Sequence, residues 1–410
     1  ALLQKDGSRV LSRDLKSLII VSAKILSVDM SDFFELTIMK MNKPPLTPAG
    51  SGERLFSLDF FRGLTMFLLI AEFTHLFTLL TDQSLESTFI YSFGTQFHHH
   101  PWNGLRFWDL IQPYFMFIVG VAMPYSVSNR MKRGQTSRQI FQHVLQRAIL
   151  LLLLGWGLYC IDAGELVPRF QNVLAQLSVT YLLAFLVMHK PARTQIIFTL
   201  MILAITEAIY RFFPVEGFNN PFVANENFGT WLDLQYGGAD LGGHWVSFNA
   251  IPTTAHTVWG VLAGLLLKSD KTMQKKLKVL LIAGTILLIA GYTAAQFTPI
   301  IKRICTSSFV LVSGGWTVLT LAFSFWLIDI MKQKKWSLFF AIVGMNPLFI
   351  YLFAHVGGAN FIEHIIHPFS MAFFGWTGEL TSKILTNSIV LFLLWYICYW
   401  FYKRNVFIRI

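Results

Sequence analysis

Long apolar runs, each ending at a cluster of charged or turn-forming residues, are the feature that most constrains this chain. A helix that crosses the roughly 30 Å hydrocarbon core of a bilayer needs about 20 mostly apolar residues. The candidate runs lie near 56–80, 107–127, 144–161, 173–189, 194–212, 248–267, 277–297, 308–330, 338–356 and 384–402. The sequence therefore predicts an all-α polytopic membrane protein with about ten transmembrane helices, in contact with the lipid bilayer.

The composition of the 410 residues excludes the main alternatives to a membrane protein. Apolar residues make up 54% and charged residues 13%, whereas about a quarter of the residues in a soluble domain are charged. This composition rules out a disordered chain and argues against a soluble enzyme. In a membrane protein a net charge of +11 sets orientation before it binds nucleic acid, so no nucleic-acid partner is expected. The three cysteines lack metal-ligand spacing, and no metal is predicted.

The basic residues divide unequally between the two sets of alternating loops. Most of the 33 Lys and Arg residues lie near the chain ends and in the loops after the second, fourth, sixth and eighth predicted spans. The opposite loops and helix ends hold only Arg106, Arg169, Arg211, Lys302, Arg303 and Lys383. By the positive-inside rule both termini are predicted to be cytoplasmic, as an even number of spans requires.

Three regions follow from this pattern. Residues 1–54 are predicted to be a cytoplasmic N-terminal tail, 55–402 the transmembrane domain and 403–410 a cytoplasmic C-terminal tail. The apolar stretch 18–28 is too short to span a bilayer, and no small-residue cleavage site follows it. Because Met39 and Met41 begin a short basic tail, residues 1–38 are expected to be non-native or unprocessed.

Two pairs of ionisable residues lie in the first predicted span, where a charge is costly and therefore a functional candidate. Asp59 and Arg62 are three residues apart near the cytoplasmic end, so they share a helical face and can neutralise each other. Glu72 and His75 have the same spacing near the outer end, where a carboxylate can tune an imidazole. A helix clamp and an interfacial ion pair are the structural alternatives.

A histidine-rich segment, His98-His99-His100-Pro101-Trp102-Asn103-Gly104, precedes the second predicted span, and Asp109 lies at the start of that span. An imidazole just outside the membrane could lie over a pore and exchange protons near neutral pH. Such a cluster is also typical of an exposed loop or an adventitious metal site. Asp109 likewise has a structural interpretation, because a helix dipole favours an acid in the first turn.

The predicted outer connection 213–247 has no Lys or Arg but holds acids, glycines and the aromatic residues Trp231, Tyr236 and Trp245. Aromatic faces beside asparagines and carboxylates suit a sugar, particularly one with an amine. The same composition is typical of an aromatic belt at the membrane interface, and both interpretations stay open.

Several blocks together resemble a known family. They are Arg54-Leu-Phe-Ser57-Leu58-Asp59-Phe-Phe-Arg62-Gly63, Trp102-Asn103-Gly104 with Asp109, Pro113 and Gly120, Val173-Leu174-x-Gln176, Ser247-x-x-x-Ile251-Pro252, Thr306-Ser307-Ser308 with Gly314-Gly315, and Gly344-Met345-Asn346-Pro347. In this order, over residues 54–402, they resemble the transmembrane acetyltransferases typified by lysosomal heparan-α-glucosaminide N-acetyltransferase and its bacterial relatives.

The resemblance implies transfer of an acetyl group from cytosolic acetyl-CoA, as co-substrate, to a glucosamine amine across the membrane. The family's catalytic histidine stands three places before the Trp of Trp-Asn-Gly, which is His99 here. The lysosomal member has an asparagine at the place of Phe73, so either the adjacent Glu72 takes that polar role or the acceptor differs. The other candidates are Asp109 as catalytic, Trp102, Asn103, His75 and Asn249 as substrate-binding, and Asp59 and Arg62 as structural residues on the acetyl-CoA side.

The expected location is a bacterial inner membrane with the catalytic mouth facing the periplasm. His99 could act as a general base or carry the acetyl group covalently, and the sequence does not choose between them. A secondary transporter for a small polar or sugar solute is the alternative from another class, because intramembrane acids and broken helices also line transport sites. An acyltransferase for another envelope glycan and a homodimeric assembly are also open.

Overall fold

The computed structural model describes residues 55–333 and 336–408, and these residues form helices and connecting loops without a β-strand. The helices are α3 (Phe56–Glu72), α4 (Leu76–Leu79), α5 (Phe89–Gly94), α6 (Ile111–Lys132), α7 (Ser137–Ala163), α8 (Val173–Val187), α9 (Ala192–Phe212), α10 (Phe228–Gln235), α11 (Ala250–Lys268), α12 (Met273–Ala294), α13 (Ser307–Phe325), α14 (Ser337–Val343), α15 (Pro347–Phe353), α16 (Ala359–Phe374) and α17 (Glu379–Arg404). Short 3-10 or π turns are η1 (Gln83–Leu85), η2 (Thr95–Phe97), η3 (Phe107–Leu110), η4 (Ser247–Asn249), η5 (Trp326–Ile330), η6 (Ala354–Gly358) and η7 (Gly375–Thr377). The predicted tail 1–54 lies outside the described residues.

Eight helical segments in the described part of the chain are long and apolar enough to cross a membrane. They are Phe107–Lys132, Ser137–Ala163, Ala192–Phe212, Ser247–Lys268, Met273–Ala294, Ser307–Ile330, Pro347–Thr377 and Glu379–Arg404. Local capping explains several helix starts, because the side chains of Thr136, Asn172 and Thr272 accept hydrogen bonds from backbone N–H groups of the first turn. The prediction of an all-α polytopic membrane protein is confirmed.

Two of the predicted spans are shorter helices than the sequence suggested. The run 56–80 divides into α3, of 17 residues, and α4, of 4 residues, because His75 between them has a left-handed backbone with φ 56°. The run 173–189 forms α8, which has 15 residues. At a rise of about 1.5 Å per residue, both helices are shorter than the hydrocarbon core is thick.

The predicted span 338–356 is not one continuous helix. It breaks at Gly344–Asn346 between α14 and α15, where Pro347 begins a new helix and disfavours helical geometry in the residue before it. The chain turns again in η6, where Gly357 has φ 98°. The turn leads into α16, a helix that the apolar runs did not predict.

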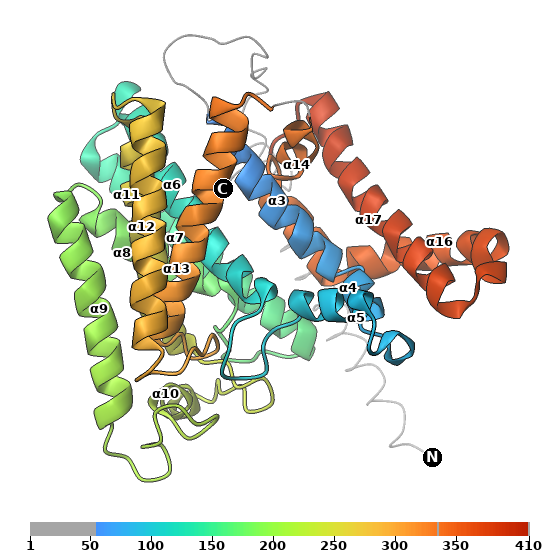
Figure 1. Ribbon diagram of the computed structural model, residues 1–410, viewed down its shortest axis with the longest axis horizontal. Coiled ribbons are helices and arrows are strands. Elements are labelled where there is room, and N and C mark those ends of the chain that lie inside the picture. Colours follow the sequence, from blue (N-terminus) through green and yellow to red (C-terminus); the bar gives the residue numbers. More distant parts are fainter. Residues whose placement is uncertain (1–54, 334–335, 409–410) are drawn as a thin grey trace, which may run out of the picture.

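The long helices pack side by side in a bundle (Figure 1). The most extensive contacts join α12 to α13, α11 to α6, α7 to α8 and α14 to α3. The contact between α6 and α11 depends on Gly120 and Gly260, because a Cβ on either would overlap a backbone carbonyl of the other helix. Small residues that allow such a close approach are characteristic of helix pairs in membranes.

The two ends of the bundle differ. At one end α3 packs against α14. Asn346, between α14 and α15, joins this end to the chain's last described residues by donating to the Val406 carbonyl at 3.0 Å and accepting from the Ile408 amide at 2.8 Å. The opposite end carries α4, α5 and α10 (Figure 1) and the loops at 98–106, 213–247 and 295–306. The candidate site lies at this loop-bearing end.

Candidate active site

A cavity of about 270 Å³ lies at the loop-bearing end of the bundle. Helices α3, α6, α7, α8 and α15 contribute to its wall, together with the turn η3 and four loops. The lining residues are Leu69, Glu72, His99, Trp108, Ile111, Gln112, Phe115, Tyr159, Gln171, Asn172, Val173, Gln176, Trp245, Lys302 and Tyr351. Residues as far apart in the sequence as Leu69 and Tyr351 therefore line the same cavity, and the predicted residues Glu72 and His99 are among them.

The histidine-rich segment is held by the loop before α13. Asn103 forms an isolated antiparallel bridge with Ile301, and the Gly104 amide donates to the Ile300 carbonyl at 2.8 Å. The Asn103 side chain accepts from the Ile300 amide at 3.1 Å. Gly104 has φ 152°, and a Cβ there would overlap the His100 ring, so this turn requires glycine.

Trp102 also anchors this segment, because its indole N–H donates to the Phe222 carbonyl at 2.8 Å. Trp102 and Asn103 were predicted to bind substrate, but neither lines the cavity. Their observed contacts fix the position of the loop that carries His99. Substrate binding by these two residues stays a prediction without geometric support.

The three adjacent histidines have different surroundings. His98 Nε2 lies 3.1 Å from Thr81 Oγ1 and 3.3 Å from the Phe77 carbonyl oxygen. The His100 ring packs over Gly104, and its buried Nδ1 has no hydrogen-bond partner in the described part of the chain. Of the three, His99 lines the cavity. Among the described residues, no group of three or more His, Cys, Asp or Glu side chains is arranged to hold a metal ion.

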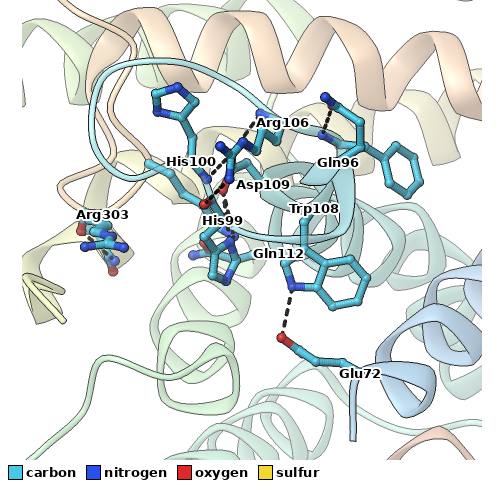
Figure 2. A network of polar contacts seen from close by, with 12 residues as sticks. Glu72, Gln96, His99, His100, Arg106, Trp108, Asp109, Gln112 and Arg303 are labelled. Atoms are coloured by element: carbon cyan, nitrogen blue, oxygen red, sulfur yellow. Dashed lines mark hydrogen bonds and ion pairs between the residues drawn. The ribbon is translucent and has the colours of Figure 1, made fainter. Parts of the chain in front are cut away.

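His99 and Asp109 form the centre of a polar network (Figure 2). His99 Nδ1 lies 3.0 Å from Asp109 Oδ1 and 3.1 Å from Lys302 Nζ. Asp109 Oδ2 accepts from the backbone amides of Arg106 and His100 at 2.9 and 3.2 Å. Because the Asp109 side chain is only 1% exposed and its other oxygen is occupied, the carboxylate has a fixed orientation toward His99.

The charges around His99 favour its neutral form. Burial, reinforced by the positive charge of Lys302, lowers the pKa of His99 to about 4, although the bond to Asp109 acts in the opposite direction. Burial also lowers the pKa of Lys302 to about 8, and the charges of Asp109 and Glu72 oppose that shift. Near pH 7 the imidazole is therefore neutral, and one of its two ring nitrogens carries a lone pair.

Glu72 lies at the C-terminal end of α3, where its Oε1 accepts the indole N–H of Trp108 at 3.1 Å (Figure 2). The expected side-chain interaction between Glu72 and His75 is not formed, although the His75 amide donates to the Glu72 carbonyl at 3.0 Å. Helix α3 ends between them and His75 has a left-handed backbone, so the spacing that joins side chains on one helical face is lost. His75 is exposed and does not line the cavity.

A chain of buried amides begins in the cavity wall and continues into the protein. Gln112 donates to Gln176, and Gln176 donates to Asn249 Oδ1 at 2.7 Å. Asn249, predicted to bind substrate, is fully buried and supports Gln176 rather than lining the cavity. Gln171 continues the network by donating to Asp233 Oδ2 at 2.8 Å, which ties the cavity wall to the connection 213–247.

Asp59 and Arg62 are paired as predicted, with Arg62 Nη2 donating to Asp59 Oδ1 at 2.7 Å. The pair lies in the first turns of α3, and neither residue lines the cavity. A role on the acetyl-CoA side stays a prediction.

Sequence reasoning missed Lys302 and the position of Trp245. The Trp245 ring centroid lies 5.3 Å from the His99 ring centroid. Lys302 Nζ lies 5.4 Å, and Arg303 Cζ 5.6 Å, from the Trp245 ring centroid. The charge pattern could have indicated Lys302, because Lys302 and Arg303 are adjacent cations in the set of alternating loops that holds few basic residues.

Comparison with known proteins reveals partial similarity. Heparan-alpha-glucosaminide N-acetyltransferase of Mus musculus is 30% identical over 147 residues, which are 33% of this chain and 19% of that protein. The Homo sapiens protein of the same name is 30% identical over 138 residues, 31% of this chain and 18% of its own. The match thus spans about a fifth of the relatives' length. The chain is related to these proteins, and no family model matches it.

Proposed function

We propose that the protein is a transmembrane N-acetyltransferase that moves an acetyl group from acetyl-CoA on the cytoplasmic side to the amine of a glucosamine-type sugar on the outer side. The location proposed is a bacterial inner membrane, with the cavity facing the periplasm. The observation that carries the proposal is the position of His99, which lies 3.0 Å from the buried Asp109 carboxylate and lines a cavity that also holds Glu72. The relationship to two acetyltransferases supports the reaction type.

His99 is the proposed catalytic residue. When its Nδ1 donates to Asp109 Oδ1, the lone pair of neutral imidazole is on Nε2, which forms no hydrogen bond with a described residue. That nitrogen can remove the proton that the amine loses as it attacks the thioester carbonyl. It can also attack the thioester itself, in which case the acetyl group passes to the imidazole, the thiolate leaves, and the amine attacks in a second step.

Glu72 and Trp245 are the proposed acceptor-binding residues. A sugar amine is mostly an ammonium group at neutral pH, so a carboxylate in the cavity attracts it, and the hydrogen bond from Trp108 orients that carboxylate. The indole face of Trp245, next to His99, suits the apolar face of a sugar ring.

The volume of the cavity limits the acceptor. About 270 Å³ is near the lower end of the roughly 300–1,000 Å³ of typical small-molecule sites. A single sugar unit at the end of a glycan fits this limit better than a longer segment does.

The direct test is acetyl transfer by purified protein in detergent. Acetyl-CoA and glucosamine together should yield free CoA and N-acetylglucosamine without an ion gradient. His99→Ala should lower this rate by about 10²–10⁴-fold and still bind acetyl-CoA. His98→Ala is the matched control and should retain most activity, because His98 contacts Thr81 and does not line the cavity.

Two results would change the assignment. Gradient-driven sugar uptake into proteoliposomes, without CoA release for any acceptor, would replace the acetyltransferase with a transporter. CoA release with a different glycan but not with glucosamine would retain the reaction type and correct the acceptor.

A further inference from the structure

Lys302 lies in the cavity wall beside the proposed catalytic group. Its side chain is 7% exposed, and its Nζ lies 3.1 Å from His99 Nδ1 and 3.8 Å from Asp109 Oδ1. The loop that carries Lys302 is fixed against the histidine segment by the bridge between Asn103 and Ile301. The proximity of the ammonium and the imidazole thus follows from two loops that are bonded to each other.

The two neighbours of His99 Nδ1 make incompatible demands. The Asp109 carboxylate only accepts hydrogen bonds, so it requires a proton on Nδ1. The Lys302 ammonium only donates, so it requires a lone pair on the same atom. A neutral imidazole has one N–H group and satisfies one neighbour at a time.

The two hydrogen-bonding arrangements of Nδ1 leave Nε2 of His99 in different protonation states. When the charged Lys302 donates to Nδ1, the imidazole proton is on Nε2, and that nitrogen can only donate. When Lys302 has released a proton to solvent, the imidazole proton moves from Nε2 to Nδ1 and is bound by Asp109. Nε2 then has a free lone pair and can act as a base or a nucleophile.

We propose that Lys302 is a positioning residue that selects the tautomer of His99, so that His99 becomes reactive only when Lys302 is uncharged. This inference rests on the proposed function only for its effect on acetyl transfer. The tautomer itself is a property of the resting protein and can be measured without either substrate.

The charges that face Lys302 make this equilibrium accessible. Asp109 and Glu72 favour the ammonium, whereas burial and Arg303 favour the amine, and the pKa of Lys302 is about 8 as a result. Cys305, the remaining titratable neighbour, stays a thiol because burial raises its pKa to about 12. A change of Lys302 charge therefore occurs close to physiological pH.

The test is the rate at which diethyl pyrocarbonate modifies His99, because the reagent attacks an accessible imidazole nitrogen that has a lone pair. Peptide mass spectrometry follows the modification, and His99→Gln provides the background from His98 and His100. In the parent protein the rate should fall about tenfold for each pH unit below about 8, in proportion to the uncharged fraction of Lys302. A flat rate between pH 6 and pH 9 would overturn the proposal.

Two substitutions separate this role from an ordinary ion pair. Lys302→Met removes the ammonium, so His99 should react quickly and at the same rate from pH 6 to pH 9. Lys302→Arg keeps a permanent positive charge, so His99 should react slowly throughout this range. In the acetyl-transfer assay a purely structural ion pair with Asp109 predicts that Lys302→Arg keeps more activity than Lys302→Met, whereas tautomer selection predicts the opposite, so more activity in Lys302→Arg would refute tautomer selection. Lys383→Met, in an exposed ion pair on α17, is the matched control.

The same variants connect the tautomer to catalysis. In Lys302→Met the kcat/KM for acetyl transfer should lose the rise that the parent shows near pH 8. If the parent shows the predicted modification profile but no acetyl transfer with any acceptor, the proposed function fails and the tautomer assignment stands. If acetyl transfer occurs with a pH profile unchanged by Lys302→Met, the proposed function stands and the tautomer assignment fails.

Discussion

Asp109→Asn is the substitution whose effect the structure defines most closely. Asp109 Oδ2 accepts from the backbone amides of Arg106 and His100, while Oδ1 faces His99. In an asparagine, the carbonyl oxygen must therefore take the place of Oδ2, because an amide nitrogen there would confront two N–H donors. The new NH₂ group then faces His99 Nδ1, which has to accept, and the imidazole proton is forced onto Nε2.

The expected magnitude follows from the wrong tautomer. In a His–Asp pair of this kind, the same change lowers turnover by about 10⁴-fold, and loss of a general base alone accounts for about 10²–10⁴-fold. We expect kcat for acetyl transfer to fall by about 10³-fold or more, or about 4 kcal/mol of transition-state stabilisation. The KM for the sugar should change little, because Glu72 and Trp245 remain in place.

The assay is CoA release at saturating acetyl-CoA, together with the thermal unfolding midpoint in detergent. Asp82→Asn is the matched control, because Asp82 is an exposed helix cap whose side chain accepts from the Ser84 amide, a bond that asparagine also makes. An Asp109→Asn protein that is folded and retains more than a tenth of parental kcat would refute the assignment of Asp109 as the group that orients His99.

Three further predictions concern the loop, stability and orientation. Gly104→Ala should destabilise the protein by about 1–3 kcal/mol and reduce activity, measured as unfolding midpoint and CoA release, whereas Gly134→Ala, with positive φ but no neighbour within 4 Å, should cost only about 1 kcal/mol. Stability should rise between pH 8 and pH 10. In this range the unfolded chain, in which Lys302 has the ordinary lysine pKa of 10.5, binds more protons than the folded protein, in which the pKa of Lys302 is about 8. An equal rise in the thermal unfolding midpoint of Lys302→Met over this range would contradict the prediction. In intact cells an impermeant thiol reagent should label a cysteine at Gly242 and not one at Met273, and reversed labelling would invert the proposed topology.

The sequence predicted the helices better than their interruptions. Apolar runs identify most long helices, because each must satisfy its backbone internally and present an apolar surface. They did not predict the left-handed His75, which ends α3 and removes the expected contact with Glu72. The break before Pro347 is a sequence signal that the apolar pattern of 338–356 concealed.

The site was predictable only in part. His99 and Asp109 are ten residues apart and belong to one local motif, so they could be proposed together from the sequence. Lys302 could not, because its sequence separation from His99 is 203 residues and their contact depends on how two loops pack. For Trp102 and Asn103 the structure adds a role that the motif did not indicate, since both anchor the loop, while substrate binding by them stays a prediction.

The bridge between Asn103 and Ile301 also has a consequence for biosynthesis. A chain is made from its N-terminus, at about 5–20 residues per second, so the histidine segment is synthesised many seconds before the loop that holds it. Until residues 300–302 have followed α12 to the loop-bearing end, His99 has neither its Lys302 neighbour nor the bridge that fixes its loop. Nascent chains that stop within α12 should therefore contain every residue of the histidine motif and still be unable to assemble the pocket, so insertion of the later helices acts as the timing step for this site.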